Sequence, residues 1–331
     1  MGHDIVRLHH VGHIVEDMAQ AITLYERLGF RVPPPSCPAI PRHEGGEPEP
    51  FGTGNTHADF PHSFLELVAW IQDGATDRLP DDTRIVPLQA PAEVLPELVE
   101  RIRETSANVA ERLEAFQGLH ILMFSSPDIR SAAARLSDAG VRHGGVNTVR
   151  RPSDTSDGVT TVRYLEIDDA PDAGPGAVTE GRVGVVAELD PDIQRAGLLD
   201  HPNGAVDLVD CVLCVADTEL VATERRYEAR LGRTARQDGP ARVFELDDAA
   251  LALVPASRLD ELLPGERPAA LPAFVACTVA VRDLDRTEAL LRRNGLPVRT
   301  TPSGDLFVPA EAALGAAIAF RQAGIGDTAR T

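Results

Sequence analysis

The chain has 331 residues, 43% of them hydrophobic, and is therefore long enough to form two compact domains with buried cores. Its 51 acidic and 32 basic residues give a formal net charge of −19, which argues against binding to nucleic acid or to an anionic membrane surface. No apolar run approaches the ~20 residues that cross a bilayer, and no secretory signal is visible. We therefore expect a cytoplasmic protein that acts on a small molecule.

A unit that recurs four times organises the chain. Each unit begins with a strand rich in Val, Leu and Ile, passes an acidic turn and continues as an amphipathic helix. An Asp at or near the start of each helix can accept hydrogen bonds from backbone N–H groups, and a glycine ends the helix. About three further strands follow each helix, so each unit predicts a β-α-β-β-β module. The strand-helix segments cover residues 8–32, 119–143, 208–235 and 274–298.

Clusters of Pro and Gly mark the boundaries between these units. Residues 33–55 form a long insertion that could cover a site, and residues 91–117 predict a helical connector. The segment HPNGA at 201–205 separates the two halves of the chain. We predict two domains, the first at 1–200 with modules at about 5–70 and 117–190, and the second at 206–323.

Two cysteines, Cys211 and Cys214, have the CxxC spacing of redox and zinc sites. They lie in the apolar segment DCVLCVAD, which predicts a strand, and alternation along a strand would turn them to opposite faces. We therefore expect both to pack in the core, which fits a reducing compartment.

The segment RLHHVGHIVED at 7–17 holds three histidines in a predicted strand. Neighbouring side chains of a strand alternate between its faces, so His9, His10 and His13 cannot converge on one ion. We expect His9 and His13 to point to the helix layer and to serve packing. His10 is the candidate for chemistry, with partners that lie far away in the sequence.

The repeated unit resembles the vicinal oxygen chelate superfamily, which includes glyoxalases and extradiol dioxygenases. The resemblance rests on the LHH start of the first strand, on FGTGNTHADFPHSFLELVAW at 51–70 and on HPNGA at 201–205, and it is nearest to the glyoxalase-like branch. In that superfamily two units pair into an open sheet that curls around a metal ion. The resemblance implies an α+β fold of four modules that pair into two curled, mixed-sheet domains.

The resemblance also implies four metal ligands, one from the first and one from the last strand of each N-terminal unit. Glu166 is the rival of Glu188, because the strands of the second unit can be counted in two ways. Counting back from Asp128 places Ile121 at the ligand position, so the choice of His120 requires one extra residue in the turn. The ligands that the resemblance implies are His10, Glu66, His120 and Glu188.

Such a donor set suits Zn, Ni, Fe(II), Mn or Co rather than a soft thiolate metal. With Glu66 as a ligand, the resemblance implies a glyoxalase-like enzyme that chelates vicinal oxygens and stabilises an enolate-like intermediate, with Glu66 or Glu188 moving the proton. Without Glu66, the remaining ligands would form the two-histidine, one-carboxylate set of an Fe(II)-dependent extradiol-type dioxygenase. A third alternative is a non-catalytic protein that sequesters a natural product.

Polar residues near the insertion and on the strands of the second unit are candidates for substrate contacts. The asparagine could equally cap a turn, the histidines could lie in a solvated loop, and the arginines could simply be exposed. These candidates are Asn55, His57, His62, Arg150, Arg151 and Arg163.

The second half of the chain lacks the ligand residues. At the position of His10, the third unit has Asp210 and the fourth has Ala276. We therefore expect this half to be a metal-free structural partner, a substrate cap or an oligomerisation surface, the last of which would make a homodimer.

Overall fold

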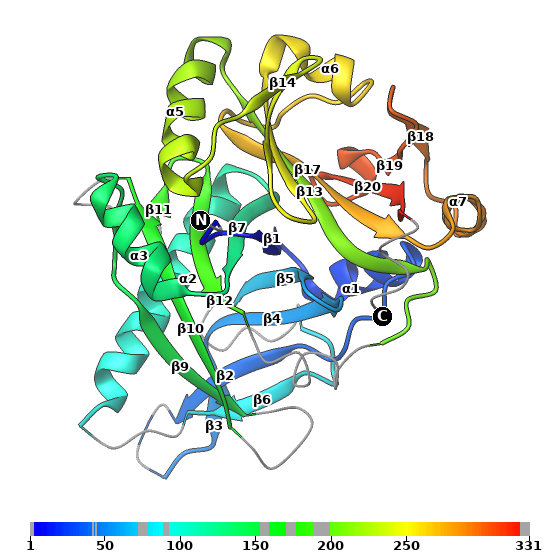
Figure 1. Ribbon diagram of the computed structural model, residues 1–331. Helices are drawn as coiled ribbons and strands as arrows, with labels where there is room; N and C mark the ends of the chain where they lie inside the picture. Colours follow the sequence, from blue (N-terminus) through cyan, green and yellow to red (C-terminus); the bar gives the residue numbers. More distant parts are fainter. Residues whose placement is uncertain are drawn as a thin grey trace.

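The computed structural model describes residues 3–41, 43, 45–71, 79–88, 93–152, 159–169, 177–188 and 199–324. Within these residues, four modules follow one another along the chain, from blue to red in Figure 1. The first module consists of β1 (Arg7–Val15), α1 (Met18–Arg27), β2 (Ser36–Pro41), β3 (Pro48–Pro50), β4 (Gly52–Asp59) and β5 (Phe64–Ile71). Strand β6 (Arg84–Pro87) and helix α2 (Leu95–Ala115) connect it to the second module, and α2 confirms the predicted helical connector.

The other three modules repeat this order of elements. The second consists of β7 (Gly118–Ser126), α3 (Ile129–Asp138), β8 (Arg142–His143), β9 (Asn147–Pro152), β10 (Val159–Asp168), β11 (Ala177–Val178) and β12 (Gly181–Ala187). The third consists of β13 (Ala205–Val215), η1 (Asp217–Glu219), α5 (Leu220–Leu231), β14 (Arg236–Asp238), β15 (Ala241–Glu245) and β16 (Ala250–Pro255), followed by η2 (Ala256–Arg258) and α6 (Leu259–Leu262). The fourth consists of β17 (Ala273–Val281), α7 (Leu284–Arg293), β18 (Arg299–Thr300), β19 (Leu306–Val308), η3 (Ala310–Ala312) and β20 (Ala317–Gln322).

Strand pairing follows the same rule in every module. The last strand lies parallel to the first, so that β5 pairs with β1, β12 with β7, β16 with β13, and β20 with β17. Within each half the two first strands pair antiparallel, β1 with β7 and β13 with β17. A contact between Phe274 of β17 and Leu119 of β7 connects the two half-sheets. The result is a large, curled, mixed sheet, and the predicted α+β fold is confirmed.

The helices begin at the aspartates that the sequence indicates. Side-chain oxygens of Asp17, Asp128 and Asp283 accept hydrogen bonds from backbone N–H groups in the first turns of α1, α3 and α7. Helix α5 differs, because the 3-10 turn η1 leads into it, and it ends at Gly232 with a φ of 65°. No helix in the described part of the chain is both long and apolar enough to cross a membrane.

Helices of the two halves pair with each other. Figure 1 shows α1 and α7 on one side of the molecule and α3 and α5 on the other. The Arg27 guanidinium donates to the carbonyl of Asn294 at 3.1 Å, and the Asn294 side chain donates to the Arg27 carbonyl at 2.7 Å. Arg135 of α3 donates to the carbonyls of Ala229 and Arg230 at the end of α5, both at 2.8 Å. These contacts hold the modules of one half against those of the other.

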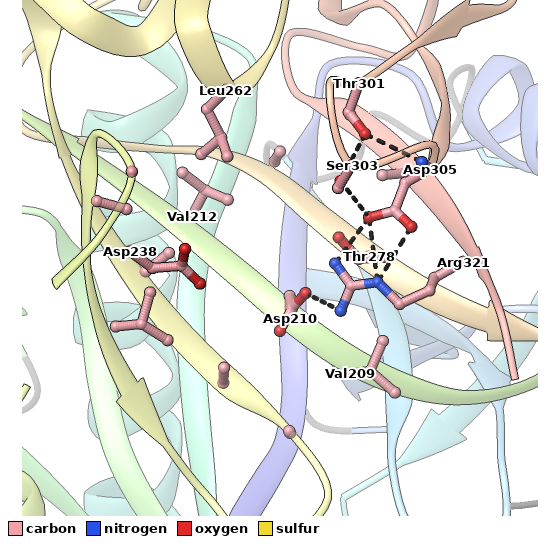
Figure 2. Close-up of a pocket in the computed structure, with 18 of the residues that line it drawn as sticks. Val209, Asp210, Val212, Asp238, Leu262, Thr278, Thr301, Ser303, Asp305 and Arg321 are labelled. Carbon is pink, nitrogen blue, oxygen red and sulfur yellow. Dashed lines mark hydrogen bonds and ion pairs between the residues drawn. The ribbon is translucent and has the colours of Figure 1, made fainter. Parts of the chain in front are cut away.

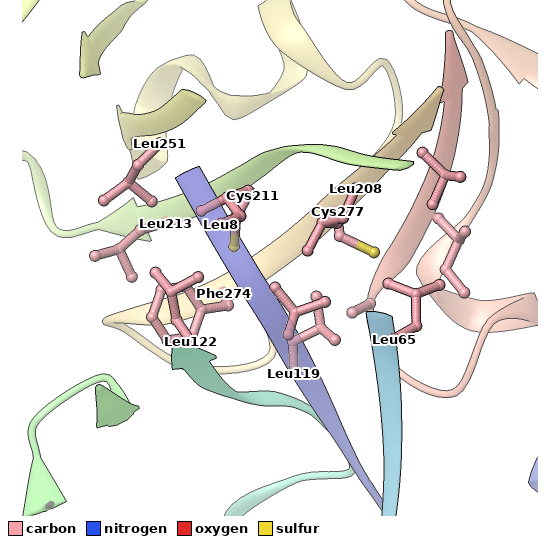
Figure 3. Packing of buried hydrophobic residues seen from close by; sticks show 14 of the residues in the cluster. Leu8, Leu65, Leu119, Leu122, Leu208, Cys211, Leu213, Leu251, Phe274 and Cys277 are labelled. Carbon is pink, nitrogen blue, oxygen red and sulfur yellow. The ribbon is translucent and has the colours of Figure 1, made fainter. Parts of the chain in front are cut away.

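One cluster of buried side chains lies between the sheet and the helices and extends through both halves. Figure 3 shows how β1, β7, β13 and β17 contribute to it. Cys211 belongs to this cluster and Cys214 to a second one, so the prediction that they occupy opposite faces in the core is confirmed. Because both halves share one core, the division into two domains at 201–205 stays a prediction.

Candidate functional site

The N-terminal half-sheet has two different faces. Alternate residues of its strands pack toward the helices in the shared core, and the residues between them face the other way. The second face carries an apolar cluster and a group of polar and charged side chains. We call this face the N-terminal cup, and its central residues are His10, Glu66, Ile121, Glu166 and Arg182.

The first strands of the two modules identify one pair of corresponding positions. His10 stands seven residues before the helix N-cap Asp17, and Ile121 stands seven residues before the N-cap Asp128. The antiparallel register is symmetric about this pair, because His10 lies opposite Met123 and Ile121 lies opposite the residue two after His10. Ile121 is therefore the counterpart of His10.

The last strands identify the second pair. Glu66 of β5 lies opposite Gly12, which is two residues after His10. In the second module the residue two after Ile121 is Met123, and Gly184 of β12 lies opposite it. The four positions that the superfamily resemblance assigns to metal ligands thus hold His, Glu, Ile and Gly.

The His10 ring contacts three neighbouring side chains, those of His9, Phe64 and Glu66. A β-bulge between Leu8 and His10 brings Nδ1 of His9 to 2.7 Å from Nδ1 of His10, although alternation predicts opposite faces for the two rings. The His10 ring stacks on Phe64 with centroids 4.4 Å apart, and its Nε2 lies 3.7 Å from Oε2 of Glu66. Since the two Nδ1 atoms share one proton, the direction of that bond decides which nitrogen of His10 acts as a base.

Glu66 is held by its neighbours on the adjacent strand. Its side chain is 14% exposed, and the amide of Asn55 donates a hydrogen bond of 3.0 Å to its Oε1. His57 lies opposite Glu66 on β4, and its ring contacts Phe64 with centroids 4.7 Å apart. Two of the predicted substrate contacts, Asn55 and His57, therefore belong to the cup, and Asn55 orients the carboxylate.

The opposite side of the cup holds an ion pair. Arg182 of β12 lies opposite Ile121, and its Nε and one terminal nitrogen both contact Oε1 of Glu166. The Glu166 side chain is 9% exposed, and that of Arg182 is 33% exposed. Burial lowers the pKa of Arg182, but the charges of Glu166 and then Glu66 outweigh burial and hold this pKa above its ordinary value. Glu66, Gly12, Ile121 and Arg182 lie in one row across four adjacent strands, so the carboxylate and the guanidinium stand at the two ends of the same row.

His120 does not join this group. The register between β1 and β7 shifts at His120, which forms a bulge in the strand, and the turn between β7 and α3 holds no extra residue. Nε2 of His120 lies 2.8 Å from the carbonyl oxygen of Phe116, and the two rings are 4.2 Å apart. Burial lowers the pKa of His120 to about 4, and its charge is one of the causes that lower the pKa of His13. Ile121 and Met123 belong to the apolar cluster of the cup, whereas Leu119 and Leu122 belong to the core on the other face, so Ile121 and not His120 faces the cup.

The carboxylate predicted at the end of the second module also lies elsewhere. A Cβ at Gly184 would come within 2.4 Å of the carbonyl oxygen of Leu165, so this position has no room for a side chain. Glu188 stands four residues later, roughly 13 Å further along the strand direction. It contacts Nε of Arg7 at 3.5 Å, and its side chain is 39% exposed. Its rival Glu166 does lie in the cup.

The remaining predicted residues have other places. His62 lies in the turn between β4 and β5, and Arg163 is exposed on the face of β10 opposite to Glu166. The side chains of Arg150 and Arg151 lie outside the described residues. His13 faces the helix layer as expected. Its Nδ1 lies 3.1 Å from the hydroxyl of Tyr25, its Nε2 lies 2.6 Å from the carbonyl oxygen of Leu314, and burial lowers its pKa to about 4.

The donor set does not fit the four-ligand metal centre that the resemblance implies. Two of the four positions offer a donor, His10 and Glu66, while an isoleucine and a glycine without room for a side chain occupy the others. Among the residues that the structure describes, no group of three His, Cys, Asp or Glu side chains is placed to hold a metal ion. The guanidinium of Arg182 instead stands opposite Ile121, paired with the carboxylate of Glu166.

Two features of the cup were not predicted. Helix α2 packs its buried Val109 against the apolar part of the cup, beside Ile14, Val68 and Ile121, and so covers one end of it. Arg182 was missed as well, although a single charge inside the apolar strand RVGVVA is a signal that could have indicated it.

Paired β-α-β-β-β modules with a polar cup on the face away from the helices define the vicinal oxygen chelate superfamily. The chain belongs to the glyoxalase-like domain family, which its sequence matches over residues 8–232. No curated protein matches the chain significantly in sequence.

Solved structures agree on the fold. A hypothetical protein from Staphylococcus aureus is similar over 96% of this chain and 100% of its own, with a TM-score of 0.57 at 10% identity. A mutant 4-hydroxymandelate synthase from Streptomyces coelicolor gives a TM-score of 0.56 at 14% identity, over 99% and 96% of the two chains. An Mn(II)-bound glyoxalase from Novosphingobium aromaticivorans gives 0.53 at 10% identity, over 96% and 82%. At such identities the likeness shows the fold alone.

Proposed function

We propose that the chain is a glyoxalase-like enzyme of the isomerase or lyase type, which moves a proton next to a carbonyl group of a small oxygenated substrate in the N-terminal cup. The observation that carries this proposal is the arrangement of Arg182 and Glu166 against His10 and Glu66. The four side chains lie on one face of one sheet, where Arg182 pairs with Glu166 and His10 pairs with Glu66. This arrangement supports proton transfer by the protein's own side chains.

Arg182 supplies the electrophilic side of the site. Glu166 engages Nε and one terminal nitrogen, and the guanidinium carries five N–H donors in all. The second terminal nitrogen can therefore donate to a carbonyl oxygen. When a proton leaves the neighbouring carbon, negative charge develops on that oxygen, and a fixed cation in a partly buried site stabilises it.

His10 and Glu66 supply the proton-transfer side. In the proposed step, Nε2 of His10 removes the proton from the carbon next to the carbonyl group, and the electron pair of the C–H bond forms the enolate. Glu66, held by Asn55, stabilises the charge that His10 gains, because its Oε2 lies 3.7 Å from Nε2. In an α-hydroxyketone, return of the same proton to the former carbonyl carbon, with transfer of the hydroxyl proton to the former carbonyl oxygen, completes an isomerisation without any oxidant or reductant.

The metal-dependent forms of the prediction receive less support from the geometry. A glyoxalase-like metal centre would need donors at the positions of Ile121 and Gly184, and the dioxygenase set would need His120 and Glu188 beside His10. We therefore derive no step through a metal ion.

Deuterium exchange tests the proposal. Hydroxyacetone, acetoin and 2-hydroxyacetophenone, three α-hydroxyketones of increasing size, are incubated with the protein in D₂O, and loss of the proton signal next to the carbonyl group is followed by NMR. We expect exchange with at least one ketone, slowed by about 100-fold in His10→Gln and in Arg182→Gln. A chelator should leave the exchange unchanged.

Arg163→Gln is the matched control, because it removes the same charge from a neighbouring strand but from the opposite face. It should exchange at the wild-type rate. Exchange that stops on chelation and returns with added Mn²⁺ would overturn the proposal in favour of a metal-dependent enzyme. Absence of exchange with all three ketones would also contradict it.

A further inference from the structure

The C-terminal half contains a cavity of about 630 Å³. It lies on the face of β13, β16, β17 and β20 that carries Asp210, Ala252, Ala276 and Ala319, and we call this face the C-terminal cup (Figure 2). Ala252 lies opposite Val212, two residues after Asp210, and Ala319 lies opposite Thr278, two residues after Ala276. The positions that correspond to His10, Glu66, Ile121 and Gly184 are therefore Asp210, Ala252, Ala276 and Ala319. The three alanines leave the space empty, and its volume falls within the range of small-molecule pockets.

One end of this cavity holds two carboxylates on one guanidinium. A terminal nitrogen of Arg321 lies 2.5 Å from Oδ2 of Asp210, and Nε and the other terminal nitrogen contact Asp305 at 2.7 to 3.1 Å. The side chains of Asp210 and Asp305 are 18% and 11% exposed. Burial raises the pKa of Asp210 to about 6 in spite of Arg321. The group carries one net negative charge at neutral pH, so a further cation would stabilise it.

An unpaired hydroxyl points to the same end. Thr278 is 5% exposed and lines the cavity, and its hydroxyl forms no hydrogen bond with any residue that the structure describes. Figure 2 places Thr278 beside Arg321 and Asp305. The hydroxyl oxygen opens onto the cavity, where a ligand that donates a hydrogen bond can pair with it.

The lining as a whole is acidic. Seven carboxylates and two guanidiniums, those of Arg236 and Arg321, face the cavity. Three of the carboxylates also contact arginines outside the lining, namely Arg7, Arg233 and Arg258. The excess of carboxylates disfavours an anionic ligand and attracts a cationic one. The other walls are apolar and are formed by Val209, Val212, Val243, Leu246, Leu262 and Leu263.

We propose that the C-terminal cup binds a small organic amine, with its ammonium group at Asp210, Asp305 and Thr278 and its apolar body against the valine and leucine walls. This site is separate from the N-terminal cup and gives the second half of the chain a binding function of its own. The ammonium group would donate to the Thr278 hydroxyl and to the two carboxylates. The acceptor lone pairs of these carboxylates outnumber the N–H donors of Arg321, so acceptor positions remain for the ammonium group.

Three probes of equal size and different charge test this proposal. Binding of 2-naphthylmethylamine, 2-naphthylmethanol and 2-naphthoate is measured by isothermal titration calorimetry at about 0.15 M salt, where exposed charges are screened beyond about 8 Å. We expect one amine per chain, bound at least about tenfold more tightly than the alcohol, and no binding of the acid. Equal affinity for the amine and the alcohol, or no saturable binding of the amine, would overturn the proposal.

Variants locate the site. Ala252→Phe should fill the cavity and abolish binding of the amine, and Asp210→Asn should weaken it about tenfold. Thr278→Val breaks no hydrogen bond with the residues that the structure describes, so it should fold normally and weaken binding about fivefold. Asp285→Asn, which removes an exposed charge from the same half, and His10→Ala in the other cup should bind as the wild type does. Binding that survives Ala252→Phe or disappears in His10→Ala would place the amine elsewhere and contradict the proposal.

Discussion

The N-terminal and C-terminal cups have the same scaffold but different side chains at their four corresponding positions. The N-terminal cup keeps one histidine and one glutamate, His10 and Glu66, whereas the C-terminal cup has Asp210 and three alanines. Helix α2 covers the apolar part of the first cup, while the second contains a cavity of about 630 Å³.

Both cups place an arginine among carboxylates. Arg182 pairs with Glu166 in the first cup, and Arg321 binds two aspartates in the second. A guanidinium is a permanent cation with fixed donors, so it can serve some of the electrostatic purposes of a metal ion. Under the two proposals made above, the same scaffold supports proton chemistry where a histidine base is present and binding of a cation where carboxylates are present without one.

The largest effect on the free energy of unfolding is expected at a last-strand position, where the two cups differ in the space they leave for a side chain. Gly184→Ala should lower the free energy of unfolding by about 3 kcal/mol, because its Cβ would meet the carbonyl oxygen of Leu165. At the corresponding C-terminal position, Ala319→Gly should cost only about 1 kcal/mol. Urea denaturation of both variants measures the comparison. If Gly184→Ala were as stable as the wild type, a side chain would fit at the fourth ligand position after all.

The ion pair of the N-terminal cup should have the next largest effect. Arg182→Met leaves the carboxylate of Glu166, which is 9% exposed, without its cation, and should cost about 2 to 3 kcal/mol in unfolding free energy. The double variant Arg182→Met, Glu166→Gln should recover most of this loss. The control Arg163→Met should change stability by less than about 0.5 kcal/mol. Equal losses in the single and the double variant would show that the pair does not stabilise the cup.

The contributions of His120 in the first half and Asp210 in the second half to the free energy of unfolding should change with pH in opposite directions. The pKa of His120 is lowered by burial from 6.5 to about 4, so the unfolded chain binds more protons between these values and stability falls as the pH falls from 6.5 to 4. His120→Gln should remove about 2 kcal/mol of this acid-induced loss. Urea denaturation at a series of pH values checks it. An unchanged pH profile would mean that His120 is not buried in its neutral form.

The C-terminal counterpart is Asp210. Burial raises its pKa from 3.8 to about 6, so the folded chain binds more protons between these values and this group's contribution to stability falls as the pH rises from 4 to 6. Relative to the wild type, Asp210→Asn should therefore gain about 1 kcal/mol in unfolding free energy between pH 4 and pH 7. A difference that is constant with pH would contradict the burial of this carboxylate.

The fold could be predicted from the sequence because each module repeats the same local signals. Asp17, Asp128 and Asp283 mark helix starts, and apolar strands precede each of them. The pairing of helices from the two halves could not be predicted. It depends on side chains such as Arg27 and Arg135, which contact carbonyl groups more than ninety residues away. The homodimer and the cytoplasmic location stay predictions.

The site could be predicted only in its first module. His10 and Glu66 lie where the motif places them, because the strands that carry them have the expected register. In the second module a bulge at His120 turns the histidine away from the cup and brings Ile121 into it, and only the spacing from Asp128 indicated this. Alternation along a strand is a reliable guide to its faces only where the register is continuous.

Metal analysis tests the central claim most directly, namely that the N-terminal cup acts through its own side chains. Protein purified without a histidine tag is analysed by inductively coupled plasma mass spectrometry, alongside His10→Ala. Because only two of the four ligand positions offer a donor, we predict far less than one equivalent of any transition metal per chain, unchanged in the variant. One tightly bound equivalent that disappears in His10→Ala would contradict the account and restore the metal-dependent glyoxalase.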